Sequence, residues 1–403
     1  MKHMKYLRKC TLLLCFLTAS LSLSACGSKE ARQLDNHQTK KQLHTGKNTS
    51  TMSKELLPVK VTDTTFTRLS PTELQICWSD SLNPYVAKYD VLRKCPEHSQ
   101  WTVIQTLHSD GETLGRTLAV TDTLSNDSMQ QYLYRVDVTV SSPDKYKSES
   151  GKEIPATNLI LCIDAGHFEG KNAIASDTLG YAEGDFTLSL AMELEKTLKE
   201  TYGISSKLTR NSGTITIDGY ENQQLDSSHI SLRGEMAKNC DLFVSLHTNA
   251  NLENAGGSPT EQQPVSINKP IILVNSVALD NPTALRIANE VGCRLAAASF
   301  DRGLSETKAF REAQKEEILE WTDAYNDSRH EEGTVCKRTG TKGDYYGVLR
   351  GASNVNVSGL IIEHGFHTVP EVRQAAVKGD LKAVWSKADA EGIAAGFGLV
   401  KNN

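Results

Sequence analysis

The C-terminal part of the chain alternates short apolar runs with longer stretches in which apolar residues recur every three or four positions. The short runs are typical of strands that are buried on both faces of a sheet, and the longer stretches predict helices with one apolar face. This alternation predicts an α/β domain, with a mostly parallel or mixed sheet covered by helices, over residues 156–403. The predicted strands are Leu159–Ile163, Ile204–Leu208, Leu242–Leu246, Ile271–Val274 and Leu360–Ile362; the predicted helices begin near Phe186, Ser231, Pro282 and Pro370. Residues 301–345 are polar and irregular, which predicts an insertion with a short helix near Lys308–Trp321.

Residues 57–153 have a different pattern, in which apolar and polar positions alternate. Leu74, Ile76 and Trp78 are separated by single polar or small residues, and similar runs recur before Ser, Asn, Pro and Asp clusters. Period-two alternation predicts antiparallel strands, and hence an all-β sandwich. The early Trp78 and the late Tyr134 resemble the core and corner residues of a fibronectin type III domain; another small β-sandwich is the alternative. We expect a spacer or a binding module here.

The first residues predict export from the cell. A basic stretch precedes an apolar run, Thr11–Leu23, that is too short to span a bilayer comfortably. The residues Leu23-Ser-Ala-Cys26 resemble the bacterial lipoprotein box. This resemblance implies a signal peptide over residues 1–25, lipidation of Cys26 and tethering outside the cell membrane. An ordinary secretory signal with an incidental cysteine is the alternative. Residues 26–56 are polar and predict a flexible linker.

Charge and cysteine content exclude some function classes. The formal net charge is −5, and removal of residues 1–25, which carry four basic residues and no acidic one, makes it −9. An acidic mature protein is poorly suited to binding nucleic acid phosphates. Six of the nine cysteines remain after the signal and Cys26 are set aside, and none forms a Cys-x-x-Cys pair. A cysteine-ligated metal is therefore disfavoured, and the spacing selects no disulfide pairing.

Three of the predicted strands end in residues that are chemically capable. The first strand runs into Asp164-Ala-Gly-His167, the second into His247-Thr-Asn-Ala250, and a later one into Glu363-His-Gly-Phe366. Ligands of open α/β sheets collect outside the carboxyl ends of the strands, so these side chains are expected to form one site. A catalytic zinc ion takes three His or carboxylate ligands, and a further carboxylate acts as the base. His167, His247 and Glu363 supply three of these four groups, and one acidic residue remains to be identified.

The motifs resemble those of the zinc-dependent N-acetylmuramoyl-L-alanine amidases, which are bacterial cell-wall hydrolases, over about residues 158–400. The resemblance lies in Asp164-x-Gly-His167, Glu183, Ser245-Leu-His247-x-Asn-Ala250 and Ile362-Glu363-x-Gly-Phe366, with support from Lys207-Leu-Thr-Arg210, Ser231-Leu-Arg233 and Val348-Leu-Arg350. It implies one Zn²⁺ held by His167, Glu183 and His247, and Glu363 as the catalytic base. It also implies peptidoglycan as the substrate, with Asn249 and Arg350 as candidate substrate contacts and no organic cofactor.

Some positions depart from the family pattern. Ala165 stands where the family often has Pro, and Phe168-Glu169 stand where it usually has Gly-Gly. Two unusual imidazoles, His364 and His367, follow Glu363; they could tune that carboxylate, bind a second metal, or support the site from behind. Two other functions stay open, namely a zinc carboxypeptidase-like peptidase acting on wall peptides and a non-catalytic lipoprotein that binds the wall. The peptidase class usually pairs its first ligands as His-x-x-Glu, which this chain lacks.

Overall fold

The computed structural model describes residues 55–112, 114–173, 178–214, 230–250, 252–253, 263–264, 267–322 and 331–401. The predicted signal peptide, Cys26 and all but the last two residues of the predicted linker lie outside this part of the chain. Among the described residues, no helix has both the length and the apolar character needed to cross a membrane.

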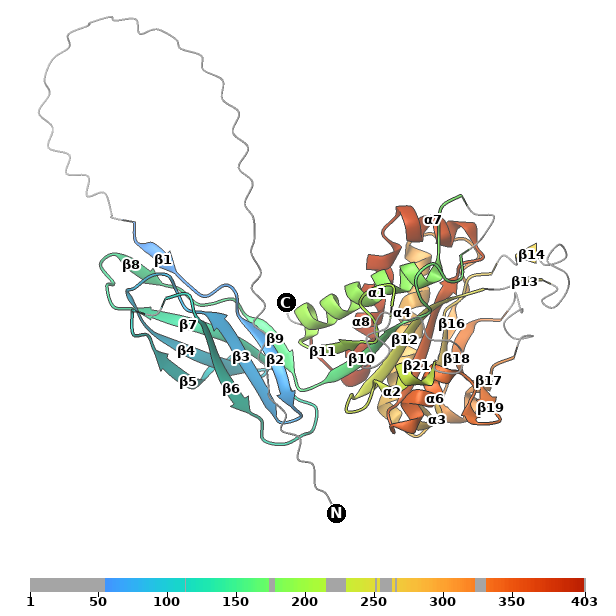
Figure 1. Ribbon diagram of the computed structural model, residues 1–403, viewed down its shortest axis with the longest axis horizontal. Helices are drawn as coiled ribbons and strands as arrows, with labels where there is room; N and C mark the ends of the chain where they lie inside the picture. Colours follow the sequence, from blue (N-terminus) through green and yellow to red (C-terminus); the bar gives the residue numbers. More distant parts are fainter. Residues whose placement is uncertain are drawn as a thin grey trace, which may run out of the picture. The chain divides into compact units, whose positions relative to one another are not determined.

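The N-terminal domain is all-β, as the alternating pattern predicts (Figure 1). Its strands form a sheet in the order β2-β3-β6, a second sheet in the order β5-β4-β7-β9, and the pair β1-β8. Apolar side chains from both of the larger sheets share one buried cluster, which includes Trp78 and Tyr134. The strands are β1 (Leu57–Val59), β2 (Thr65–Ser70), β3 (Glu73–Ser79), β4 (Val86–Lys94), β5 (Thr102–His108), β6 (Thr117–Thr123), β7 (Gln131–Val140), β8 (Tyr146–Ser148) and β9 (Ile154–Thr157).

The C-terminal domain is built on a mixed sheet, which the described residues form in the order β11-β10-β12-β21-β15-β18-β16, with β17 also paired to β18; the short strands are β16 (Phe310–Arg311) and β17 (Leu319–Glu320). The strands β11, β10, β12 and β21 are mutually parallel, and β15 runs antiparallel to β21. In Figure 1, β10, β12 and β21 lie side by side. The main strands are β10 (Ile160–Ala165), β11 (Ser205–Leu208), β12 (Leu242–Asn249), β15 (Ile271–Val274), β18 (Gly333–Lys337) and β21 (Gly359–Phe366).

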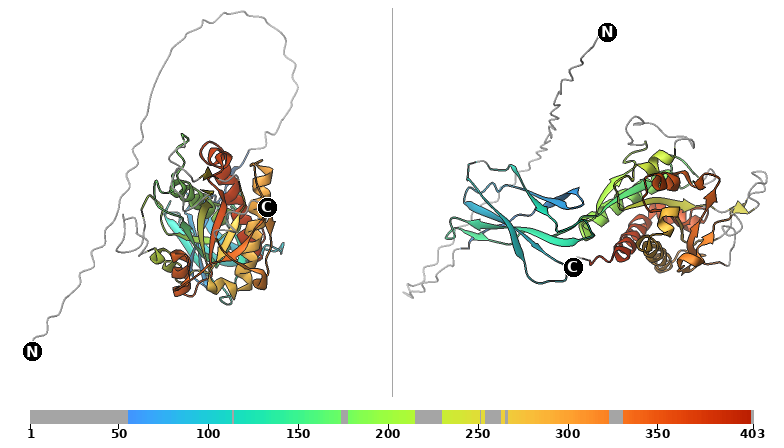
Figure 2. Two further views of the ribbon diagram at one scale, coloured as in Figure 1. Left: turned by 90° about the vertical axis from the view of Figure 1, so that its right-hand side faces the viewer. Right: turned by 90° about the horizontal axis from the view of Figure 1, so that it is seen from below.

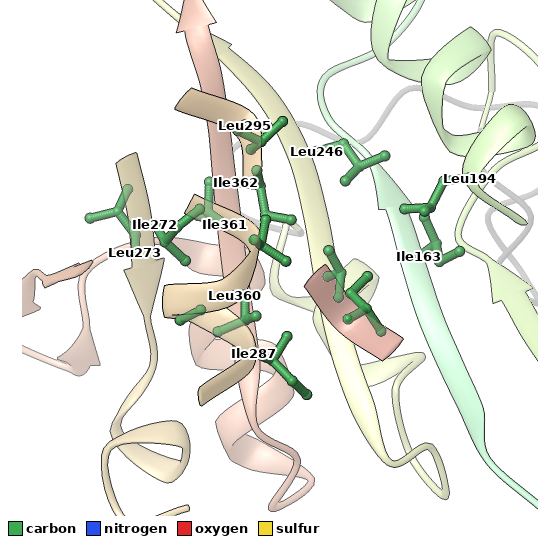
Figure 3. Packing of buried hydrophobic residues seen from close by; sticks show 14 of the residues in the cluster. Ile163, Leu194, Leu246, Ile272, Leu273, Ile287, Leu295, Leu360, Ile361 and Ile362 are labelled. Carbon is green, nitrogen blue, oxygen red and sulfur yellow. The ribbon is translucent and has the colours of Figure 1, made fainter. Parts of the chain in front are cut away.

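Helices cover this sheet and bury its apolar residues. Helix α8 packs against both α4 and α1, and α2 packs against α6. In Figure 2, α4 is orange and α8 is red, and the two helices are adjacent. Figure 3 shows Ile287 and Leu295 of α4 near the β21 side chains, and Leu194 of α1 beside Ile163 of β10. The helices are α1 (Glu183–Thr197), continued by a π-helix (Leu198–Tyr202), α2 (Ser231–Glu235), α3 (Ser276–Leu279), α4 (Pro282–Asp301), α6 (Gly347–Asn354), α7 (Pro370–Lys378) and α8 (Leu381–Phe397).

The region predicted as an irregular insertion contributes strands to the sheet instead. Strand β18 pairs with β15 in parallel, and Val335 and Cys336 of β18 are fully buried. This apolar run is too short to stand out in the sequence, which explains why strand β18 was not predicted; whether the region is an insertion stays a prediction. Within the described range 308–321 the chain forms no α-helix; it forms β16 (Phe310–Arg311), a short 3-10 helix (Lys315–Glu317) and β17 (Leu319–Glu320). The hairpin strands β19 (Thr339–Gly340) and β20 (Gly343–Asp344) follow, and β13 (Leu252–Glu253) pairs with β14 (Gln263–Pro264).

Candidate metal centre

The carboxyl ends of three adjacent parallel strands carry the candidate residues. His167 lies two residues beyond β10, His247 lies in β12, and Glu363 lies in β21 directly opposite His247. Because β10, β12 and β21 are parallel neighbours, their carboxyl ends lie at the same edge of the sheet. The structure therefore brings together the three strand ends singled out in the sequence.

The turn after β10 requires a glycine and presents His167. A side chain on Gly166 would collide with the carbonyl oxygen of Leu246, 2.4 Å from the Cβ position, and with the ring of His247. His167 itself has a positive φ of 59°, an uncommon conformation for a residue with a side chain. The backbone thus turns sharply here, and it does so against the strand that carries the second histidine.

Two buried arginines hold this turn in place. The Nε of Arg233 donates to Oδ1 of the fully buried Asp164 at 2.8 Å, and its Nη1 donates to the carbonyl oxygen of His167 at 3.2 Å. Arg210 donates to the carbonyl oxygens of Ala165 and Gly166 at 3.0 and 3.1 Å. Backbone carbonyls that the turn leaves unpaired are thereby satisfied, which a buried polar group requires.

Asp164 remains ionised in spite of its burial. Burial by itself raises the pKa of this carboxyl, but the positive charge of Arg233 and hydrogen bonds from Ser245 and Thr209 outweigh it, so that the pKa lies below the ordinary value. The hydroxyl of Ser245 donates to Asp164 at 2.6 Å and lies 3.1 Å from Nε2 of His247. The carboxylate thus supports the second histidine through one intervening hydroxyl.

Glu183 is the first residue of α1, and its side chain is almost completely buried. Its Oε1 accepts a hydrogen bond from the backbone N–H of Thr248 at 2.8 Å, and its Oε2 accepts one from the side chain of Asn172 at 2.8 Å. A carboxylate at a helix N-terminus is favoured by the helix dipole. Burial raises its pKa, but hydrogen bonds with His167 and His247 dominate and lower the pKa well below its ordinary value.

The three candidate ligands form one compact group. Nδ1 of His247 lies 3.2 Å from Nε2 of His167 and 3.2 Å from Oε1 of Glu183. One donor atom from each of these three residues can be chosen so that all lie within 4.8 Å of one another. Burial is the largest influence on His247 and lowers the pKa of its ring, which favours the neutral form that binds metals. Two imidazoles and one carboxylate match the ligand set of catalytic zinc sites.

Glu363 adjoins this group but is not part of it. Its Oε2 is buried and has no hydrogen-bond partner among the described residues. A buried unpaired carboxylate oxygen is costly, so such an atom points to a partner that the described residues do not supply. Burial and the charge of Glu183 both raise the pKa of Glu363 well above its ordinary value. The donor set and this unpaired oxygen together fit a metal ion with its associated water.

A cleft of about 400 Å³ opens beside these residues. His167, His247 and Glu363 contribute polar groups to its lining, and the remaining wall is largely apolar. Lys171 lies at the same cleft with an exposed side chain. The other lining residues are Phe168, Ile230, Arg233, Tyr346, Gly347, Val348 and Ile361.

The two residues that the sequence suggests as substrate contacts do not line the cleft. The side-chain oxygen of Asn249 accepts from the N–H of Ala250 at 2.8 Å. Nη1 of Arg350 donates to the carbonyl oxygens of Asp344 and Tyr345, so this arginine holds the chain that leads to Tyr346. Neither residue lines the cleft described above. Their contact with substrate stays a prediction.

Several supporting residues have no role in the sequence prediction. The side-chain amide of Asn172 lies 3.1 Å from Nε2 of His167 as well as 2.8 Å from Glu183, although nothing in the local sequence marks this asparagine. Arg210 and Arg233 lie in family-like motifs, but a motif alone does not reveal that both hold the turn at Gly166. Tyr346 could be found only from the shape of the cleft.

The fold and the site define an α/β protein with a candidate metal centre at the carboxyl ends of its central strands. A profile of the family described as N-acetylmuramoyl-L-alanine amidase matches residues 161–395, which is more than half of the chain. The chain therefore belongs to the N-acetylmuramoyl-L-alanine amidase family, and it is an enzyme of that class.

Solved structures similar to this chain include several amidases. The N-acetylmuramoyl-L-alanine amidase from Clostridium difficile 630 is 17% identical, with 59% of this chain and 95% of that chain covered and a TM-score of 0.38. The catalytic domain of the amidase CwlV from Bacillus (Paenibacillus) polymyxa is 18% identical, with 59% and 97% covered and a TM-score of 0.37. The amidase from Mycobacterium smegmatis is 16% identical, with 60% and 97% covered and a TM-score of 0.38. No curated protein matches the chain.

Proposed function

We propose that this chain is a zinc-dependent amidase that hydrolyses the bond between N-acetylmuramic acid and L-alanine in peptidoglycan. Membership of the amidase family supports the reaction. The observation that carries the metal dependence is the grouping of His167, Glu183 and His247 next to the unpaired carboxylate oxygen of Glu363. Family membership also disfavours the carboxypeptidase-like alternative.

Glu363 would carry out both proton transfers of the hydrolysis. Glu363 takes a proton from the attacking water while the oxygen of that water bonds to the carbonyl carbon of the lactoyl group. The same side chain then returns the proton to the alanine nitrogen as the carbon–nitrogen bond breaks, which gives a free carboxylate and a free amine.

His167, Glu183 and His247 would hold the ion, and Asn172 and the Thr248 amide would orient the carboxylate ligand. When bound there, Zn²⁺ acts as a Lewis acid that polarises the amide carbonyl and makes water more acidic. The largely apolar wall of the cleft suits the methyl groups of the lactoyl and alanyl units and keeps bulk water from them.

Removal of the metal is expected to abolish cleavage of purified cell wall. Treatment of the purified chain with a strong chelator should stop the release of free L-alanine amino termini, and stoichiometric Zn²⁺ should restore it. Amino termini are measured by chemical labelling, and the cut position is read by mass spectrometry of the released fragments. Addition of Zn²⁺ to the untreated chain serves as the control for inhibition by excess metal.

Each alternative function predicts another result. Fragments cut within the stem peptide would support the carboxypeptidase-like peptidase. Binding of the zinc-loaded chain to the wall without any product would support a non-catalytic wall-binding protein. Either result would reject the proposed reaction.

The same proposal places the enzyme outside the cell, anchored to the membrane by lipid on Cys26, which lies outside the described residues. In bacteria that make lipoproteins, the chain should incorporate a labelled fatty acid and fractionate with membranes. Cys26→Ser should remove the label, because the acyl chain is attached through the thiol. Cys95→Ser, which removes a thiol in the all-β domain, should retain it. Labelling of the Cys26→Ser variant, or an unlabelled natural chain, would contradict the anchor.

A further inference from the structure

Strand β21 carries one residue more than β12 at the site. His247 pairs with Glu363, but Asn249 pairs with Phe366, so that three steps along β21 match two steps along β12. Such a bulge changes the direction of side chains and interrupts the regular hydrogen bonds between the strands. The segment of β21 that carries the bulge also contains His364, and His367 follows the end of that strand.

His364 bonds to the backbone of the candidate ligand His247. Nδ1 of His364 lies 2.9 Å from the carbonyl oxygen of His247, and because a carbonyl can only accept, Nδ1 donates. Nε2 of the same ring lies 2.7 Å from Oδ2 of Asp389 in α8. Both side chains are fully buried, and the ring packs near Trp385 with 5.3 Å between the ring centroids. With both nitrogens engaged, His364 has none left for a second metal.

His367 supports the next residue of β12. Its Nδ1 lies 3.1 Å from the carbonyl oxygen and 3.0 Å from the hydroxyl of Thr248. Its ring stacks on Tyr181, whose hydroxyl lies 2.6 Å from the same Thr248 hydroxyl. The N–H of Thr248 is the group that donates to Oε1 of Glu183. His367 is therefore connected to the carboxylate ligand through Thr248, and its Nδ1 also lies 4.0 Å from Oε2 of Glu183.

We propose that His364 and His367 are positioning residues that hold the end of β12 at this bulge, so that His247 and Glu183 are oriented to bind the metal. The two imidazoles engage consecutive carbonyl oxygens, those of His247 and Thr248. The inference rests on the proposed function, since it requires that the site bind a metal. Groups that hydrogen-bond to metal ligands commonly change metal affinity by about 10- to 100-fold when they are removed.

Paired substitutions separate the hydrogen bond to β12 from the volume of the ring. An Asn amide can place a donor near the position of Nδ1, whereas a Gln amide reaches toward the position of Nε2. We therefore expect His364→Asn and His367→Asn to retain most of the Zn²⁺ affinity. His364→Gln and His367→Gln should bind Zn²⁺ about 10- to 100-fold more weakly. Affinity is measured by competition with a chromophoric chelator, and ligand geometry by the absorption spectrum of the Co²⁺-loaded chain.

The controls distinguish a positioning role from a loss of folding. Ser299→Ala removes a hydrogen bond to Trp385 in the same interior without touching β12, and it should leave Zn²⁺ affinity unchanged. Thermal unfolding of each metal-free variant shows whether the fold is retained. Equal Zn²⁺ affinity and equal Co²⁺ spectra for the Gln and Asn members of both pairs would overturn the inference. Absence of Zn²⁺ binding by the natural chain would overturn the proposed function itself.

Discussion

Replacement of Glu363 by glutamine is expected to lower kcat for wall cleavage by about 10²- to 10⁴-fold while the zinc content stays unchanged. The amide keeps the size of the side chain but cannot accept the proton of the attacking water. Zinc should remain bound because the candidate ligand group consists of His167, Glu183 and His247. Turnover is measured on purified wall, and metal content is measured by mass spectrometry of the same sample.

A matched change on the surface tests whether the effect is specific. Glu371→Gln removes one carboxylate from the exposed face of α7 and should leave kcat as it is. Full activity of Glu363→Gln would exclude Glu363 as the base. Loss of zinc from that variant would instead make Glu363 a metal ligand, which is a different error in the assignment.

Replacement of Arg233 by methionine is expected to cost about 3–5 kcal/mol of folding free energy, because it leaves the buried Asp164 without its ion-pair partner. The turn that presents His167 also loses a hydrogen bond to its carbonyl oxygen. We therefore expect weaker zinc binding together with the loss of stability. Urea unfolding followed by far-ultraviolet circular dichroism measures the first effect, and chelator competition measures the second.

The chain contains a natural control for this pair. Nε of Arg302 lies 2.7 Å from Oδ1 of Asp380, nearly the same contact as that between Arg233 and Asp164, but Asp380 is 64% exposed. Exposed pairs contribute little, so Arg302→Met should change the stability only slightly. Equal losses in the two variants would show that the buried pair has no special role.

The same pair predicts a pH dependence of stability. Because the pKa of Asp164 is lower in the folded chain than in the unfolded chain, its ionisation stabilises the fold above the unfolded value of about 3.9. That contribution is lost as the pH falls below this value toward the lower folded pKa. Arg233→Met should show a weaker loss over this range, because the carboxyl no longer has its cationic partner.

The sequence was sufficient to predict the strand ends that lie together at the candidate site. Leu242–Leu246 and Leu360–Ile362 are apolar runs bounded by polar residues, so their ends at His247 and Glu363 could be recognised without a structure. The third candidate ligand required the family resemblance, because Glu183 begins a helix, where an acidic residue is common for other reasons. Its burial and its hydrogen bond from Thr248 became apparent only in the folded chain.

The supporting residues could not be predicted because they reach the site across the fold. Asp389 lies on the last helix, twenty-five residues beyond His364, and pairs with it only because α8 packs behind the sheet. Asn172 is separated from Glu183 by eleven positions in the sequence, and its amide meets that carboxylate only in the folded chain. Strand β18 was missed for a related reason. Its few buried residues can be recognised as a strand only from their pairing with β15 in the folded chain.

The candidate ligand atoms come from the end of one strand, the first turn of a helix and the end of a second strand, so the unfolded chain has no short segment that contains all of them. An ion held there would bind only the folded state, so its binding free energy would stabilise the folded state against unfolding. Under the proposed location outside the cell, export of the chain as an extended polypeptide would thus precede metal loading. Resistance to extracellular proteases should then rise with the supply of metal, and molecules that fail to acquire an ion would be degraded first.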